Sequence, residues 1–416
     1  MTGRTIIRGG PILAADGHRW RHRAFVILIG DRIVEVAEGD PPRPESDDRL
    51  IDLEGRYLLP GMVDSHFHLI SRSASTVDDT LVAAGMLEGA ASAVTRLAGG
   101  VTSVRDCGCR HGGIHVLRQA IAAGTVPGPA AAVAGRNPTT SLAPKHWRNV
   151  VADGPAAMAA AVGAEVAAGA DFVKLILAHA EDPADWSAVT RYINDDELAA
   201  AVTAARVAGV RTGVHCEGWE EARRAVAAGV DVLDHAPLVD TATAEEMAAK
   251  GTVYVPTLWA FSDDSGIGPR TFDGAAVAVR RWQAEHLASV RRAVRAGVTI
   301  AAGSDAAGAL PPHDVLVDEM HRLTAAGLSV GDAVRAATLG GAAALGRPGE
   351  VGEISVGARA DLIVVGGDPL SDLDVLRTPS VTFAGGRAYD AGQLRQDWAA
   401  GSGDQAVTAR WAHASR

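Results

Sequence analysis

The sequence has little cysteine, no excess of basic charge and no long apolar run, and each shortage excludes a class of protein. Three cysteines in 416 residues cannot supply a disulfide framework. A formal net charge of −11 argues against a nucleic-acid partner, because such a partner requires a basic face. No apolar run approaches the length of a bilayer span, and the N-terminus lacks the basic and apolar segments of a signal peptide. We therefore expect a cytoplasmic protein with neither a nucleic-acid nor a membrane partner.

The two ends of the chain share a sequence pattern of short β-type runs interrupted by Gly, Asp and Pro. These runs are residues 5–14, 24–38, 49–60, 351–370 and 380–392. The N-terminal runs cannot close a core by themselves, because so few strands leave one face exposed. We predict that residues 1–59 and 353–400 together build one β-sandwich domain, with a larger domain inserted between them. Residues 401–416 remain as a C-terminal tail.

Residues 60–352 alternate strand-like runs with alanine-rich, helix-like runs. The strand-like runs are residues 62–69, 101–107, 130–135, 171–177, 210–216, 231–236, 252–258 and 298–305. Asn194 and Ser329 are good N-caps for two of the helices. Eight repeats of strand and helix predict an α/β fold of the (β/α)8 TIM barrel type, although a doubly wound sheet would show the same alternation.

Ionisable residues fall near the carboxyl ends of these predicted strands. They are His66, His68, Lys174, His215, His235 and Asp305. Taken singly, each has an ordinary explanation as a hydrogen-bonded histidine, a lysine that extends to solvent or an aspartate that caps a turn. The carboxyl ends of barrel strands form the active-site mouth, so we expect all six to converge. Imidazole and carboxylate groups are the ligands that Zn²⁺ and similar ions require.

Lys174 could serve a site that holds two metal ions. A protonated lysine would repel a cation, but a neutral lysine can react with CO₂ to give an anionic carbamate with two oxygens. We therefore predict that Lys174 is an N6-carboxylysine that bridges two divalent ions, Zn²⁺ or else Mn²⁺ or Co²⁺, which share a hydroxide. Asp305 would bind one ion and accept the proton of the attacking water.

The chain resembles the amidohydrolase superfamily, in the binuclear branch that includes prolidase-like, imidazolonepropionase-related and ochratoxinase-type hydrolases. Motifs that carry the resemblance occur in the family's order over nearly the whole chain. They are PGMVDSHFH, GVTSVRD, DFVKL, VHCEG, LDHA, GSDA, LSVGDAVRAATLGGAAALG and GEISVGARADLIVV. The resemblance implies cleavage of an amide C–N bond in a small molecule, such as an N-acyl amino acid or an Xaa-Pro-like dipeptide. It also implies a homo-oligomer.

The resemblance assigns the metal ligands to two ions. His66, His68 and Asp305 would bind the more buried ion, and Asp305 would also act as general base. His215 and His235 would bind the second ion, and the lysine carbamate would bridge the two.

Four further residues are expected on the substrate side of the site. By resemblance, His146 would polarise the scissile carbonyl, and Tyr192 would bind a substrate carboxylate. His313 lies in a loop from which it could reach substrate. Close relatives carry His-x-His at the fifth strand, whereas this chain has Glu217 in place of the second histidine. That change alters the charge of the pocket and puts a dipeptide substrate in doubt.

Two other functions are compatible with the same fold. A mononuclear deaminase or cyclic-amide hydrolase of the imidazolone type would use His66, His68, His215 and Asp305 and leave Lys174 without a role. A catalytically inactive scaffold protein is the other alternative. Such proteins tend to lose metal ligands, and this chain keeps all six candidates.

Overall fold

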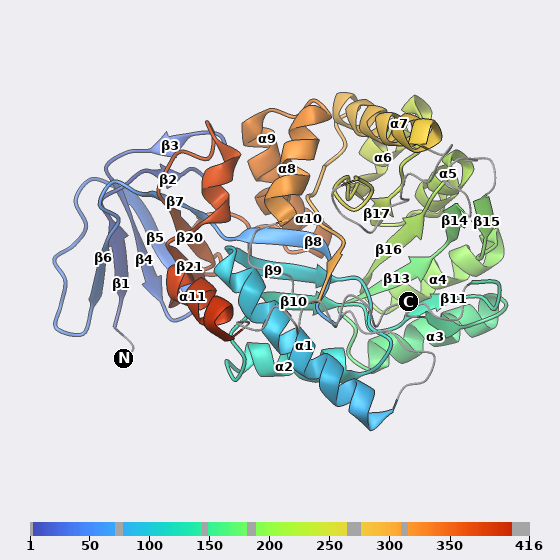
Figure 1. Ribbon diagram of the computed structural model, residues 1–416, viewed down its shortest axis with the longest axis horizontal. Coiled ribbons are helices and arrows are strands. Elements are labelled where there is room, and N and C mark those ends of the chain that lie inside the picture. Colours follow the sequence, from blue (N-terminus) through green and yellow to red (C-terminus); the bar gives the residue numbers. More distant parts are fainter. Residues whose placement is uncertain are drawn as a thin grey trace.

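The computed structural model describes residues 3–70, 78–143, 149–180, 189–263, 276–308 and 315–401. Within these residues the chain is an α/β protein with the strands of its two ends at one side and alternating strands and helices at the other (Figure 1).

Strands from both chain ends form two adjoining sheets. The first has the order β5 (Arg32–Glu38), β4 (Ala24–Ile29), β1 (Thr5–Arg8), β6 (Arg49–Asp52). The second has the order β22 (Arg387–Asp390), β21 (Val381–Ala384), β20 (Leu362–Val365), β7 (Tyr57–Pro60), β2 (Ile12–Leu13), β3 (Trp20–Arg21). Because β20 pairs with β7, the expected association of the two ends is present. Buried side chains of both sheets, among them Ile7, Leu28, Leu362 and Phe383, form one apolar cluster.

The middle of the chain forms two four-stranded parallel sheets. One has the order β10 (Ala130–Val133), β9 (Val101–Asp106), β8 (Met62–His68), β19 (Ala306–Ala307). The other has the order β13 (Phe172–Ile176), β16 (Arg211–Cys216), β17 (Val232–His235), β18 (Val253–Val255). Seven of the eight predicted strand runs therefore contain a strand. Two small pairs lie beyond them, β11 (Asn137–Thr139) with β12 (Asn149–Val151), and β14 (Ala178–Ala180) with β15 (Val189–Arg191).

Individual hydrogen bonds join the two parallel sheets along their edges. On one side, the N–H of Asp171 donates to the carbonyl of Val133 at 2.8 Å. On the other side, the N–H of Tyr254 donates to Thr299 at 2.9 Å, and the N–H of Ser65 donates to Ala302 at 2.9 Å. The segment from 299 to 302 thus bonds to a strand of each sheet.

The predicted eighth strand, residues 298–305, is wrong as a continuous strand. Ile300 alone forms a β-bridge to β18, and the short strand β19 follows the predicted run. The N–H of Ala302 donates to the π-helix η1 (Ala336–Gly340) rather than to a strand. Asp305 then adopts a φ of 52°, which interrupts extended geometry. The apolar pattern of the run reflects burial between neighbours, not a regular ladder.

Helices pack around the parallel sheets, apart from the last helix, which contacts β21 and β22 of the end sheet. They are α1 (Asp79–Ala98), α2 (Gly113–Ala122), α3 (Pro155–Ala167), α4 (Asp195–Val207), α5 (Trp219–Ala228), α6 (Thr241–Lys250), α7 (Ala276–Arg295), α8 (Val315–Ala325), α9 (Val330–Arg335), α10 (Gly341–Leu345) and α11 (Ala391–Gly401), with the 3₁₀-helix η2 (Leu373–Arg377). Both predicted caps are confirmed. Asn194 accepts from the N–H of Glu197 in a capping box, and Ser329 accepts from the N–H of Asp332.

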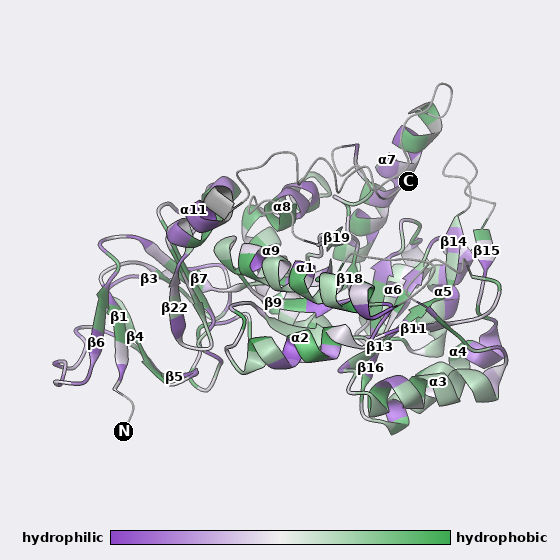
Figure 2. Ribbon diagram, turned by 60° about the horizontal axis from the view of Figure 1, so that its bottom comes forward, coloured by the Kyte–Doolittle hydropathy of each residue, from purple (hydrophilic) through white to green (hydrophobic). Residues whose placement is uncertain are grey.

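Helix α1 corrects one expectation drawn from composition. It is long and apolar enough to cross a membrane by length and composition alone, and Figure 2 shows it largely as hydrophobic. However, 44% of its most apolar window is buried inside the protein. Its buried face includes Gly89, where an added Cβ would lie 2.5 Å from Leu117 of α2. One such helix is weak evidence for a membrane span.

Candidate functional site

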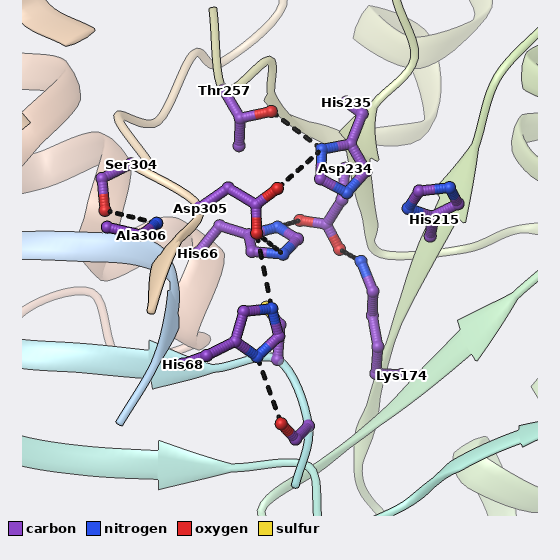
Figure 3. Close-up of polar contacts among 12 residues, drawn as sticks. His66, His68, Lys174, His215, Asp234, His235, Thr257, Ser304, Asp305 and Ala306 are labelled. Atoms are coloured by element: carbon purple, nitrogen blue, oxygen red, sulfur yellow. Dashed lines mark hydrogen bonds and ion pairs between the residues drawn. The ribbon is translucent and has the colours of Figure 1, made fainter. Parts of the chain in front are cut away.

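The six predicted metal ligands meet at the carboxyl ends of their strands (Figure 3). They come from β8 (His66, His68), β13 (Lys174), β16 (His215), the last residue of β17 (His235) and the segment before β19 (Asp305). His66 and His68 share one face of β8 because strand side chains alternate. The convergence that the sequence predicts is present.

Asp305 lies at the centre of the histidines. Its Oδ1 is 3.3 Å from His66 Nε2 and 3.4 Å from His68 Nε2, and its Oδ2 is 4.0 Å from His235 Nδ1. One ligand atom from each of His66, His68 and Asp305 lies within 4.8 Å of the others. The His235 ring stands 4.6 Å from His66 and 4.5 Å from His215, centroid to centroid.

Unusual backbone conformations place two of these side chains. His235 has a φ of 64° and Asp305 a φ of 52°, a region that residues other than glycine seldom adopt. Thr257, after β18, has a φ of 53°, and its hydroxyl lies 2.8 Å from His235 Nδ1. Such strained residues cluster at functional sites when the surrounding structure holds them there.

Sequence reasoning missed Asp234, which joins the site from β17. It is fully buried and lies 2.5 Å from Lys174 Nζ and 3.3 Å from His66 Nδ1. Arg105 of β9, also buried, donates to it at 2.9 Å. Neighbouring residues of a strand normally face opposite ways, so Asp234 and His235 were not expected together. The positive φ of His235 lets both side chains enter the site, and that feature is not readable from the pattern.

His66 and Asp305 each stabilise the charged form of the other. Burial would raise the pKa of Asp305, but the positive charges of His66 and His68 outweigh it and lower that pKa to about 2. Burial would lower the pKa of His66, but the negative groups around it, Cys107 and then Asp305, raise it to about 10. A metal ion bound by His66 would therefore displace a proton.

His215 and His235 have the opposite character. Burial, followed by the positive charge of the other histidines and Lys174, holds the pKa of each well below 6.5. Both imidazoles are therefore neutral near pH 7, which is the form that binds metal ions.

The donor set fits divalent metal ions. It combines an ionised carboxylate with imidazoles whose outer nitrogens are already oriented, as is usual for ligating histidines. His68 Nδ1 lies 3.1 Å from the carbonyl of Gly108, which turns Nε2 toward Asp305, and Thr257 fixes the ring of His235.

Glu217 lies at the edge of the histidine cluster. Its Oε1 is 3.7 Å from His215 Nε2 and 3.3 Å from His179 Nδ1, and its Oε2 accepts from the N–H of Ala180 at 2.8 Å. The buried carboxylate thus connects β16 to the β14–β15 pair beside the site. This position is compatible with its predicted role toward substrate.

The other predicted substrate contacts have different outcomes. Tyr192 is buried and lines a pocket of about 280 Å³ with Thr140, Arg191 and Asn194 near the start of α4. His146 and His313 lie outside the described residues.

Comparisons of sequence and of structure both find amide-cleaving or related hydrolases among the proteins similar to this chain. The sequence model of the amidohydrolase family matches residues 57–389. Ochratoxinase of Aspergillus niger is 25% identical over 432 residues, which cover 92% of this chain and 86% of that protein. Imidazolonepropionase of Streptomyces coelicolor is 27% identical over 377 residues, covering 87% and 90% of the two chains. A crystal structure of a Xaa-Pro dipeptidase with methionine in its active site superposes with a TM-score of 0.81 at 26% identity, covering 93% of this chain and all of that one.

Proposed function

The chain belongs to the amidohydrolase family and is a hydrolase acting on carbon–nitrogen bonds, and we propose that it cleaves an amide in a small molecule with two divalent metal ions. The observation that carries the proposal is the convergence of four histidines and Asp305 beside Lys174.

His66, His68 and Asp305 would hold the first ion, and His215 with His235 the second. Lys174, carboxylated on Nζ, would contribute to both. When bound, Zn²⁺, Mn²⁺ or Co²⁺ would polarise the amide carbonyl and make water acidic enough to react near neutral pH.

Side chains of this chain would handle the proton and the substrate. Asp305, ionised at neutral pH, would accept a proton from the attacking water and return it to the leaving nitrogen. His146 would donate a hydrogen bond to the carbonyl oxygen as negative charge develops there. Glu217, Tyr192 and His313 would contact the remainder of the substrate.

The similarity to ochratoxinase and to a Xaa-Pro dipeptidase supports N-acyl amino acids and Xaa-Pro-like dipeptides as substrate classes. Glu217 would select among these substrate classes. Its negative charge at the edge of the histidine cluster would disfavour a substrate that places a carboxylate beside it.

We further propose that the two parallel sheets are the halves of a (β/α)8 barrel over residues 60–352. The hydrogen bonds that link Asp171 to Val133 and Tyr254 to Thr299 support this closure. Residues 1–59 with 353–400 would form the β-sandwich domain, and the apolar cluster that joins their sheets supports that division.

A mononuclear deaminase or cyclic-amide hydrolase is the second candidate. The similarity to imidazolonepropionase favours it, and so does the ion pair of Lys174 with Asp234, which would suit an unmodified ammonium group.

Metal counting together with a substrate screen tests these functions. Zinc-loaded and manganese-loaded protein would be assayed against N-acyl amino acids, dipeptides, lactams and aminated heterocycles. We expect amide cleavage with two ions per chain in the wild type and in the control Lys250→Ala, whose lysine lies on α6. Lys174→Ala should retain one ion. Ammonia release with a single ion per chain would instead support the second candidate, and full activity with one ion would refute bridging by Lys174.

A further inference from the structure

The carboxylate of Asp234 makes more polar contacts than an ordinary buried ion pair needs. Its Oδ1 accepts from Arg105 Nη1 at 2.9 Å and lies 3.3 Å from His66 Nδ1. Its Oδ2 accepts from Lys174 Nζ at 2.5 Å and lies 3.4 Å from Arg105 Nη2. Each oxygen therefore faces one proposed metal ligand and one arm of the same guanidinium group. Figure 3 shows Asp234 between His66 and Lys174.

Arg105 is buried, and several neighbouring groups fix the position of its guanidinium. It is 1% exposed, its Nη1 also donates to the carbonyl of Ser65 at 3.2 Å, and its guanidinium lies 4.2 Å from the Phe172 ring centroid. Gly213 of β16 leaves the necessary space, because a Cβ there would lie 1.8 Å from Arg105 Nη2. The guanidinium thus fixes both oxygens of Asp234 in a planar, two-armed contact.

A purely structural ion pair between β9 and β17 would require Arg105 and Asp234 alone. Burying two charges costs several kcal/mol each, and an apolar pair would serve packing at least as well. Asp234 also contacts His66 and Lys174. These contacts connect the ion pair to both proposed metal positions, since His66 would hold the first ion and Lys174 would contribute to both. A histidine that binds metal through one nitrogen commonly uses the other to bond a carboxylate.

We propose that Asp234, clamped by Arg105, is a positioning residue that orients His66 and Lys174 together and thereby sets the affinity for both metal ions. The inference rests on the proposed function, because it assumes that these two side chains are ligands. Asp234 itself need not touch either ion or the substrate.

Carboxylation of Lys174 is compatible with this contact. The neutral amine attacks CO₂, a C–N bond forms, one C=O bond opens to a carboxylate, and the nitrogen releases one proton to solvent. The nitrogen of the resulting carbamate keeps a single N–H. Donation of that N–H to Asp234 Oδ2 would turn the new carboxylate away from Asp234 and toward the histidines.

The test compares Asp234→Asn with the wild type and with the control Asp231→Asn. Asp231 precedes β17 and accepts from Thr212, at the end of the sheet opposite the histidines. Zinc would be titrated into chelator-treated proteins, carbamate would be followed by ¹³C NMR after addition of ¹³C-bicarbonate, and the melting temperature of each metal-free protein would be measured.

We expect Asp234→Asn to weaken zinc binding by about 10–100-fold and to reduce the carbamate signal. The metal-free variant should fold but melt at a lower temperature than wild type, because buried Arg105 loses its charged partner. Asp231→Asn should keep both the zinc affinity and the carbamate signal. If Asp234→Asn does not fold, Arg105→Lys serves instead, because one ammonium cannot hold both oxygens. It should weaken zinc binding in the same direction.

Other results would overturn the inference. If Asp234→Asn binds zinc and forms the carbamate as wild type does, Asp234 has no positioning role. The same conclusion follows if the variant melts at a lower temperature but keeps the zinc affinity of wild type. If wild type binds two zinc ions in the same experiment, the proposed function is still supported even though the positioning role is not. A wild type that binds none would overturn the proposed function itself.

Discussion

The cluster between the two end sheets and the cluster at the carboxyl ends of β8, β13, β16 and β17 are both buried, yet they are built in opposite ways. Aliphatic and aromatic side chains such as Leu28 and Phe383 fill the first. Ionisable groups fill the second, where His235 and Asp305 also adopt strained backbone angles. Burial stabilises the apolar cluster but penalises charge, so only the second cluster depends on partners for its charges.

The largest effect is expected where this dependence is greatest, at Asp305. Asp305→Asn keeps the shape of the side chain but removes the charge that faces His66 and His68. Because Asp305 would act as general base, the variant should have a kcat/KM lower than that of wild type by about 10²–10⁴-fold, measured on the best amide from the screen. The control Asp374→Asn removes an exposed carboxylate of η2 and should retain activity. Activity of Asp305→Asn within tenfold of wild type would refute the assigned role.

The apolar cluster should respond through stability instead. Phe383 is fully buried, and Phe383→Ala should reduce the free energy of unfolding by about 3–5 kcal/mol, since it leaves a cavity. Urea unfolding measures this loss, and zinc content of the folded variant should equal that of wild type. Val356→Ala, at a side chain 66% exposed, should change stability by less than about 0.5 kcal/mol. Loss of zinc from folded Phe383→Ala would show that the two clusters are coupled.

A third prediction separates burial of charge from metal chemistry. Glu319 of α8 is fully buried and accepts from the N–H of Trp259 at 2.7 Å. Burial raises the pKa of Glu319 from 4.5 to about 8. The folded protein therefore keeps this proton while the unfolded chain loses it, so stability decreases as pH rises from about 4.5 to about 8. The slope should reach about 1.4 kcal/mol per pH unit.

Glu319→Gln should remove that slope, because the amide cannot ionise and can still accept from Trp259. Urea unfolding of the metal-free protein between pH 5 and pH 8 measures the difference from wild type, which should grow with pH. Glu245→Gln, at an exposed position of α6, should follow the wild-type curve. Parallel curves for Glu319→Gln and wild type would contradict the buried-proton explanation.

Local signals in the sequence were sufficient for much of the fold and for predicting which ionisable side chains lie together. The alternation in β8 placed His66 and His68 on one face, and the Asn194 cap located the start of α4. The fifth and sixth strand runs likewise brought His215 and His235 to one end. These features depend on residues close together in the chain.

Features that depend on tertiary contacts were not accessible in the same way. The run 298–305 is apolar because neighbours bury it, so a strand pattern appeared where the backbone is irregular. Asp234 and His235 are adjacent in a strand, and both face the site only because His235 adopts a positive φ. Arg105 lies 129 residues from Asp234 in sequence, and the glycine that makes room for it, Gly213, resembles any other strand glycine.

The smallest predicted effect concerns α4, whose first turn lines the pocket that contains Tyr192. Asn194→Ala removes the side-chain half of the capping box, so the N–H of Glu197 loses its acceptor while the backbone N–H of residue 194 can still donate to Glu197. The free energy of unfolding should fall by about 1 kcal/mol, measured by urea unfolding. Asp196→Ala removes an exposed charge from the same turn without a cap bond and, in salt, should cost only about 0.3 kcal/mol. Equal losses in the two variants would mean that the side-chain hydrogen bond of the cap contributes no more to stability than a charge near the helix start.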